Sequence, residues 1–294
     1  MSSSILAAAW VRICYHARKP VSCLCLWTMS CSSPAHPVDD AVFDDPEWIE
    51  VFVDDFDGES LDRDRWTTCY WWDKEGCTNG TTGELNWYQD DNVSIADGTL
   101  RLEARRREIL ASDGRRYDYT SGIVTTGRNS WRIERPLRFS FRYGYVEVRA
   151  KVPAGQGLWP AIWLLPTDHD IRPEIDVMEI LGHRPDRIEM NYHYTSGSAQ
   201  NEGLNWDGPD FSADWHRFAV EWRPDAIIWY VDDKERWRFT KRALIADEPM
   251  YLLLNLAVGG DWPGPPDNET VFPALFEIDY VRILQPKALV DKST

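Results

Sequence analysis

The sequence predicts an all-β protein, folded as an antiparallel sandwich or barrel. Apolar and polar residues alternate with a period of two in several stretches, which is typical of strands that bury one face. Gly, Pro, Asn and Asp separate these stretches, and helical periodicity is scarce. The 294 residues fall within the range of one large β domain, and the sequence contains no internal repeat. One folded domain over about residues 40–286 is the simplest interpretation.

The predicted strands follow one another along the chain. The first candidates are residues 50–56 and 93–103, and a turn sequence interrupts the second. Over residues 143–152, small apolar residues at every second position alternate with polar or aromatic ones, so one face of this strand is buried. Further candidates are residues 218–222, 226–231, 251–258 and 276–284. We expect a turn at Asp232–Asp233 and no more than one or two helical turns within residues 232–246.

The chain is acidic and rich in tryptophan. It contains 48 Asp and Glu against 32 Lys and Arg, a formal net charge of -16. Because nucleic acids and anionic membrane surfaces attract basic proteins, we expect neither as a partner. The same charge disfavours polyanionic substrates such as sulfated polysaccharides. The 16 tryptophans suit flat, uncharged ligands, although large β cores also use tryptophan heavily.

The first 35 residues have the order of a secretory signal. A basic stretch precedes an apolar run over residues 21–29, and a Ser-rich segment follows. No apolar run reaches the length of about 18 residues that a membrane span needs. We therefore expect a leader over residues 1–35, a mature domain over residues 36–294, and export to the cell exterior or the periplasm.

Two cysteines, Cys69 and Cys77, remain after the leader. A structural zinc site uses four ligands, and no Cys or His lies at metal-ligand spacing nearby. In an exported protein we expect these cysteines to form a small disulfide loop. A pair of free thiols is the alternative.

Three carboxylates lie close together in the stretch Glu174–Ile180. On a regular strand, Glu174 and Asp176 point to one face and Glu179 to the other, where an apolar layer makes a carboxylate costly. A one-residue bulge at Val177–Met178 returns Glu179 to the face of the other two. Neighbouring carboxylates repel, so one retains its proton, and an acid beside an ionised carboxylate is what glycosidic bond cleavage needs. A solvated acidic face or a calcium-binding surface is the alternative.

The stretch from Glu174 to Glu179 resembles the active-site motif of glycoside hydrolase family 16, in its bulged E-x-D-x-x-E form. That form is typical of laminarinase-like endo-β-1,3-glucanases, agarases and carrageenases. Further stretches resemble laminarinase-type segments in the same order, and together they extend from about Phe52 to Leu284. They are residues 119–126, 143–151, 157–166, 255–264 and 279–282. The resemblance implies a concanavalin-like β-jelly-roll sandwich with a glycan cleft on its concave face.

The resemblance also implies a retaining double displacement that uses no cofactor. Glu174 would attack the anomeric carbon, and Glu179 would protonate the leaving oxygen and then activate water. Asp176 would hydrogen-bond the nucleophile. Two inward-leaning glutamates at the ends of the row would bring their carboxyl groups to roughly 5 Å, as retention requires.

Four further residues match positions in the family's cleft. Trp159 and Trp163 would line the cleft near the cleavage point, and Trp262 would stack on a sugar further along the donor side. His193 would lie close to the acid. Each residue also has a structural alternative, a core position for a tryptophan and a buried hydrogen bond for the histidine.

Many members of this family carry a structural calcium on the convex face. The matching positions here are the carbonyl of Gly98, the side chain of Asp279 and the carbonyl of Asp55. Such an ion would stabilise the fold and take no part in the chemistry.

We therefore expect a monomeric, endo-acting hydrolase of β-1,3-glucan or mixed β-1,3/1,4-glucan. An agarase-like hydrolase of a neutral galactan and a non-catalytic glucan-binding lectin on the same fold are the alternatives. The presence of all three acids argues against the lectin. Residues 82–88 depart from the usual family sequence, with Thr-Gly-Glu-Leu-Asn where laminarinases often have Asn-Asn-Glu-Leu-Gln, and this departure concerns subsites beside the cleavage point.

Overall fold

Two β-sheets pack face to face around the main core. The computed structural model describes residues 46–70, 76–130, 132, 134–168 and 172–290. All of them belong to one unit of the chain, Ala41–Thr294. The predicted leader, residues 1–35, lies outside the described residues.

The larger sheet has ten strands in the order β14-β13-β12-β7-β16-β4-β5-β2, with β1 on β16 and β3 on β4. Its strands are β1 (Trp48–Asp54), β2 (Asn86–Tyr88), β3 (Val93–Ala96), β4 (Thr99–Leu110), β5 (Arg116–Ser121), β7 (Gly144–Lys151), β12 (His216–Trp222), β13 (Ile227–Val231), β14 (Lys234–Phe239) and β16 (Ala274–Pro286). All its pairings are antiparallel except that of β2 with β5.

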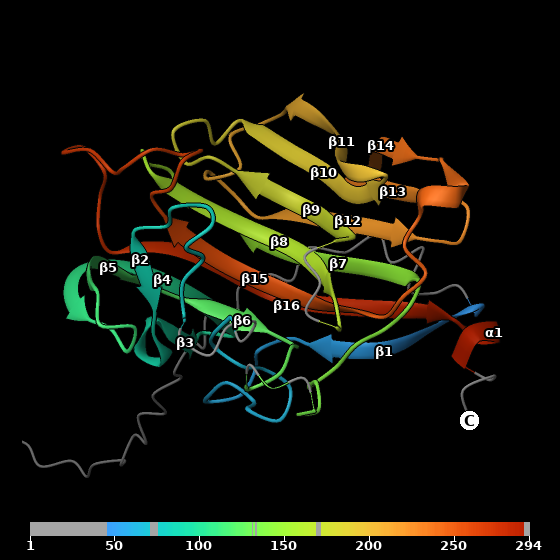
Figure 1. Cartoon of the computed structure of the whole chain (residues 1–294), viewed down its shortest axis with the longest axis horizontal. Helices are drawn as coiled ribbons and strands as arrows, with labels where there is room; N and C mark the ends of the chain where they lie inside the picture. The colour runs from blue at the N-terminus through green and yellow to red at the C-terminus, as the bar shows by residue number, and fades with distance from the viewer. Residues whose placement is uncertain (1–45, 71–75, 131, 133, 169–171, 291–294) are drawn as a thin grey trace, which may run out of the picture. The chain divides into compact units, whose positions relative to one another are not determined.

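The smaller sheet has six antiparallel strands in the order β11-β10-β9-β8-β15-β6. They are β6 (Ile123–Thr125), β8 (Leu158–Pro166), β9 (Glu174–Ile180), β10 (Arg187–Ser196), β11 (Ser198–Asp207) and β15 (Met250–Val258). Figure 1 shows β9 lying between β8 and β10. Helical structure in the described residues is limited to η1 (Asp90–Asn92), η2 (Arg242–Leu244) and α1 (Lys287–Val290).

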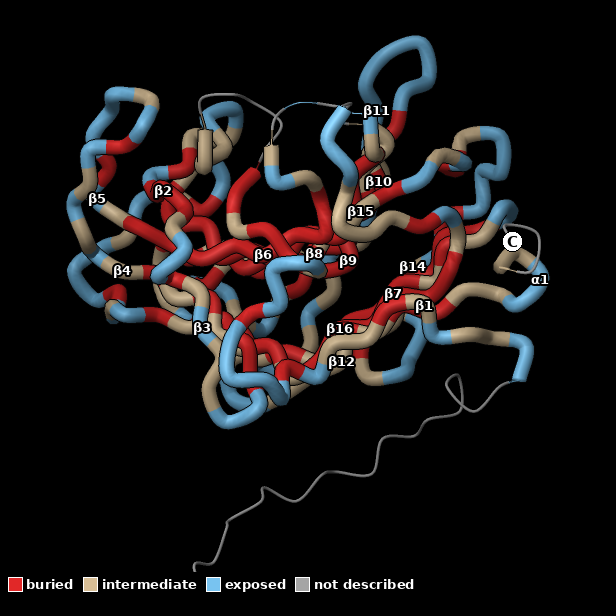
Figure 2. Tube along the Cα trace, turned by 90° about the horizontal axis from the view of Figure 1, so that it is seen from below, coloured by how far each residue is buried: buried red, intermediate tan, exposed pale blue. Residues whose placement is uncertain are grey.

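The core lies between the sheets, as the alternation predicts. On β7, Val146, Val148 and Ala150 are fully buried. From the smaller sheet, Ile175 and Ile180 of β9 join the same apolar cluster. Figure 2 shows the buried residues gathered along the strands and the exposed ones in the loops. The predicted all-β sandwich is confirmed.

The segment 232–246 contains the expected turn at Asp232–Asp233, a strand and one helical turn. Residues 234–239 form β14, which pairs with β13. Asp232 and Asp233 both have positive φ, 49° and 63°, which is the backbone of a tight hairpin turn whose twist matches the flanking strands. The single 3-10 turn η2 agrees with the expected limit of one or two helical turns.

Cys69 and Cys77 form a disulfide, as expected, with their Cα atoms 4.9 Å apart. Cys77 packs against an apolar cluster that includes Tyr70 and Tyr88. Its carbonyl also accepts a hydrogen bond from the backbone N–H of Tyr88. The bridge therefore secures the segment that leads into β2.

Gly182 fixes the end of β9 against the start of β8. A Cβ atom on this glycine would lie 2.4 Å from the carbonyl oxygen of Gly155 and 2.9 Å from Cβ of Leu158. Because backbone must move to make room, we expect Gly182→Ala to lower the free energy of unfolding by about 1–3 kcal/mol. Urea unfolding measures this, with Gly80→Ala as the matched control, since a Cβ at Gly80 meets nothing within 4 Å. Equal stability of the two variants would contradict the predicted packing.

Candidate active site

Strand β9 contains one residue more than its neighbours over the same length. On the β10 side, Glu179 pairs with Glu189 and Asp176 pairs with Asn191, so three steps along β9 match two along β10. The register with β8 shifts at the same point. The predicted bulge at Val177–Met178 is therefore confirmed.

The bulge brings the three carboxyl groups of β9 to one side of the sheet. Glu174 and Glu179 are half-buried, and Asp176 is 2% exposed. All three line one cavity of about 320 Å³. Val177 and Met178 both join the main core.

Two neutral donors hold the carboxyl group of Glu179. The indole N–H of Trp159 donates to its Oε1 at 3.2 Å, and the amide of Asn191 donates to its Oε2 at 3.1 Å. Ala161 of β8 pairs with Glu179 and also lines the cavity. Because alanine has a small side chain, the space beside this carboxyl stays open.

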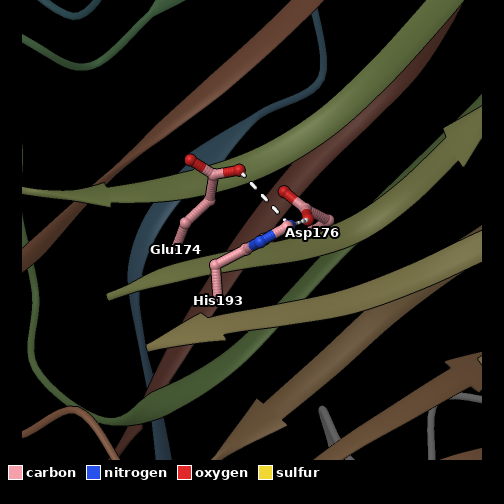
Figure 3. A group of neighbouring side chains, drawn as sticks. All are labelled: Glu174, Asp176 and His193. Atoms are coloured by element: carbon pink, nitrogen blue, oxygen red, sulfur yellow. Dashed lines mark ion pairs between the residues drawn. The ribbon is translucent and has the colours of Figure 1, made fainter. Parts of the chain in front are cut away.

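His193 of β10 lies against the other two carboxyl groups (Figure 3). Its Nε2 is 3.0 Å from Oδ2 of Asp176 and 3.7 Å from Oε1 of Glu174. These three side chains have ligand atoms within 4.8 Å of one another, the one such metal-like group among the described residues.

Burial raises the pKa of all three carboxyls. The pKa of Glu179 rises to about 8 through burial and then through repulsion by Asp176, while the bonds from Asn191 and Trp159 act in the opposite direction. Burial also raises the pKa of Asp176 to about 8. The pKa of Glu174 is raised by burial and by Asp176, and His193 opposes the rise. The site therefore retains protons near neutral pH.

The three predicted tryptophans take different positions. Trp159 and Trp163 of β8 are half-buried and line the cavity with the carboxyls. Trp262 is 44% exposed and packs edge-on against Trp159, with ring centroids 5.4 Å apart. It lines a neighbouring hollow of about 410 Å³ rather than the cavity itself.

The structure adds polar residues that the sequence analysis missed. Tyr70, Glu84 and Asn255 line the same cavity, and Asn255 accepts a hydrogen bond from the indole of Trp163 at 2.8 Å. Asn255 had a visible signal, because it is the one polar residue in the apolar run 251–258. Tyr70 and Glu84 lie outside any periodic pattern, and only the unusual sequence over residues 82–88 pointed to that region.

The predicted calcium ligands lie at neighbouring positions of the larger sheet. Asp279 pairs with Arg149, and the Asp55 side chain lies 3.9 Å from a guanidinium nitrogen of Arg282. Gly98 forms the turn between β3 and β4 with a φ of 69°. These contacts involve the side chains of the two aspartates, whereas the expected ligands from Gly98 and Asp55 are backbone carbonyls, so the calcium site stays a prediction.

A family model agrees with this geometry. The model described as "Glycosyl hydrolases family 16" matches residues 82–282.

Among curated proteins, the chain is 34% identical over 264 residues to a beta-glucanase of Rhodothermus marinus, covering 81% of this chain and 85% of that protein. It is 33% identical over 247 residues to the endo-1,3-1,4-beta-glycanase EglC of Rhizobium meliloti, covering 79% of this chain. The chain spans only 51% of that relative, and 37% of the glucan endo-1,3-beta-glucosidase A1 of Niallia circulans.

Solved structures give the same result. The endo-β-1,3-glucanase of Pyrococcus furiosus superposes with a TM-score of 0.70 at 34% identity, covering 81% of this chain and 94% of that one. The laminarinase catalytic domain of Thermotoga maritima gives a TM-score of 0.69 at 34% identity, covering 81% of this chain and 98% of that one.

The raised pKa of Asp176 predicts how a neutral replacement changes stability. A carboxyl whose pKa is higher in the folded state binds its proton more tightly there, so it destabilises the fold increasingly as pH rises from its unfolded pKa of about 4 towards 8. We expect Asp176→Asn to raise the free energy of unfolding by about 1–3 kcal/mol near pH 8 and by much less near pH 4. Urea unfolding at the two pH values measures this difference. An equal gain in the free energy of unfolding at both pH values would contradict the raised pKa of Asp176.

Proposed function

Because the chain belongs to glycosyl hydrolase family 16, we propose that it hydrolyses β-1,3-glucan or mixed β-1,3/1,4-glucan by a retaining double displacement. One observation carries the proposal: the bulged strand β9 directs Glu174, Asp176 and Glu179 into a single cavity with Trp159 and Trp163. Indole faces stack on the apolar face of a pyranose without needing charge, which suits a neutral glucan.

Glu179 is the proposed general acid. Its raised pKa keeps the carboxyl protonated at neutral pH, ready to donate the proton to the leaving glycosidic oxygen. When the proton leaves, the N–H groups of Trp159 and Asn191 already point at the new carboxylate and stabilise it. The ionised Glu179 then removes a proton from the water that attacks the intermediate.

Glu174 is the proposed nucleophile. It hydrogen-bonds Asp176, and both carboxyls have raised pKa values, so the pair shares protons as a unit. Attack on the anomeric carbon proceeds when the shared proton lies on Asp176 and Glu174 is ionised. Asp176 then donates its hydrogen bond to the nucleophile, and His193 beside both carboxyls favours this ionised form.

Trp262 is proposed as a sugar platform next to the cavity. Its exposed indole continues the aromatic surface that begins at Trp159. A glycan that leaves the cavity on this side would stack on it, which is consistent with action inside a long chain.

We further propose that the protein is exported and acts as a monomer. The Cys69–Cys77 disulfide supports an oxidising location. Among the described residues, the exposed large apolar side chains come from separate segments, which gives no support for a broad apolar interface. They are Leu85, Leu110, Trp262 and Val271. None of the described helices has the length and apolar character that crossing a membrane requires.

The first test is release of reducing sugar from laminarin, curdlan, lichenan, agarose and κ-carrageenan. We expect release from laminarin or lichenan, and a loss of about a thousandfold or more in kcat for Glu174→Gln, because the amide cannot attack. The variant is expected to retain oligosaccharide binding. Cleavage of agarose alone would support the proposed mechanism but would show that the substrate is a galactan rather than a glucan. Near-normal turnover by Glu174→Gln would remove the nucleophile assignment.

The stereochemistry of the first product tests the double displacement separately. Two inversions at the anomeric carbon restore its configuration, so the newly formed reducing end is expected to be the β-anomer. Proton NMR of a laminarin digest, recorded before mutarotation, distinguishes the anomers. An initial α-anomer would show a single displacement and overturn the mechanism.

A further inference from the structure

A fourth carboxyl group faces the cavity that holds the three carboxyls of β9. It belongs to Glu84, in the segment between Cys77 and β2, far from β9 in the sequence. The residue is 7% exposed, and burial raises its pKa to about 7. The proposed double displacement leaves this group without a role.

Glu84 is held loosely for a buried carboxyl. The Tyr70 hydroxyl donates to its Oε1 at 3.4 Å, the Thr82 hydroxyl at 3.5 Å, and the Asn79 backbone N–H donates to Oε2 at 3.5 Å. The Tyr88 hydroxyl is a further donor to this carboxyl, and its hydrogen bond opposes the rise in the pKa of Glu84. Hydrogen bonds to a carboxylate are ordinarily about 2.5–2.9 Å long. With respect to the part of the chain that the structure describes, the oxygens of Glu84 therefore have capacity for closer donors.

Glu147 provides an internal comparison. It is also buried and also bonded by two tyrosines, but it lies on β7, on the face turned away from the main core. The hydroxyls of Tyr145 and Tyr280 donate to it at 2.9 and 2.7 Å. The buried carboxyl of Glu147 thus has close hydrogen bonds from both of its tyrosines. The carboxyl of Glu84, which faces the cavity, has long ones.

A chain of hydrogen bonds leads from Trp163 towards Glu84. The indole N–H can only donate, so its bond to Oδ1 of Asn255 fixes the orientation of that amide. The amide nitrogen then donates to the Tyr88 hydroxyl at 3.1 Å, and this hydroxyl lies 3.4 Å from that of Tyr70.

Because the Tyr88 hydroxyl oxygen accepts from the amide, its own proton can point to Tyr70 or to Glu84, and either hydroxyl of the tyrosine pair can be the donor. Glu84 is the acceptor at the end of the chain. This wall of the cavity therefore presents an acceptor to whatever binds beside Trp163.

We propose that Glu84 is a specificity-determining residue that accepts hydrogen bonds from hydroxyl groups of the neutral sugar bound next to the cleavage point. The inference rests on the proposed function and deepens it. A carboxylate accepts hydroxyl protons and repels sulfate or carboxylate substituents at the same place. Glu84 thereby selects an unsubstituted sugar, while Trp163, oriented by the same chain of bonds, offers it an apolar face.

The test compares Glu84→Gln with the wild type and with Glu147→Gln on laminari-oligosaccharides. A hydrogen bond to a charged acceptor is worth about tenfold to a hundredfold in binding, so we expect Glu84→Gln to lower kcat/KM by about tenfold or more. The dissociation constant of laminaritetraose, measured by calorimetry in a Glu174→Gln background, is expected to rise by the same factor. Glu147→Gln is expected to leave both quantities unchanged.

Thermal unfolding separates a binding role from a structural one. Since burial disfavours the ionised carboxyl, Glu84→Gln is expected to unfold at the wild-type temperature or above it. Unchanged kcat/KM and unchanged affinity in Glu84→Gln would overturn this inference and leave the proposed function standing. A loss of affinity accompanied by a lowered unfolding temperature would overturn it in the same way. A wild type that neither binds nor cleaves laminari-oligosaccharides would overturn the proposed function and this inference together.

Discussion

The surplus residue in β9 is the constraint on which the site depends. Without the bulge at Val177–Met178, strict alternation would turn Glu179 towards the apolar layer between the sheets. With it, Glu179 joins Glu174 and Asp176, and both bulge residues still reach the core. A bulge disturbs the ladder of backbone hydrogen bonds, so neighbouring groups must satisfy what it frees. The carbonyl of Asp176 accepts a hydrogen bond from the indole of Trp229, in the opposite sheet, at 2.8 Å. The core of the sandwich thus supports the geometry of the cavity.

Burying three carboxyls together has an electrostatic cost that the fold has to offset. Low polarity and mutual repulsion raise their pKa values, so the site holds protons that exposed carboxyls would have lost. Trp159 and Asn191 donate hydrogen bonds to Glu179, and His193 lies against Asp176 and Glu174. The same feature that destabilises the folded state supplies an acid and a base that work near neutral pH. The carboxyls that the proposed catalysis needs therefore lower the stability of the fold.

The cavity also depends on chain segments that lie far from β9 in sequence. The segment secured by the Cys69–Cys77 disulfide supplies Tyr70 and Glu84, and β15 supplies Asn255. These residues are linked to Trp163 by one chain of hydrogen bonds, so the aromatic and polar walls are not independent. A change in this segment therefore alters the surface offered to a sugar without touching the carboxyls of β9.

The sequence alone determined the fold class, most of the strands and the three carboxyls, because period-two alternation and the spacing of acids are local properties of the chain. It also indicated the bulge in β9, because a carboxylate facing the core is costly. It indicated the Cys69–Cys77 disulfide as well. It could not show that residues 234–239 form a strand, since hairpin pairing rather than periodicity decides that segment. Nor could it bring Glu84 and Asn255 to the carboxyls of β9. Those placements depend on contacts between distant segments, which only the packing of the two sheets and their loops establishes.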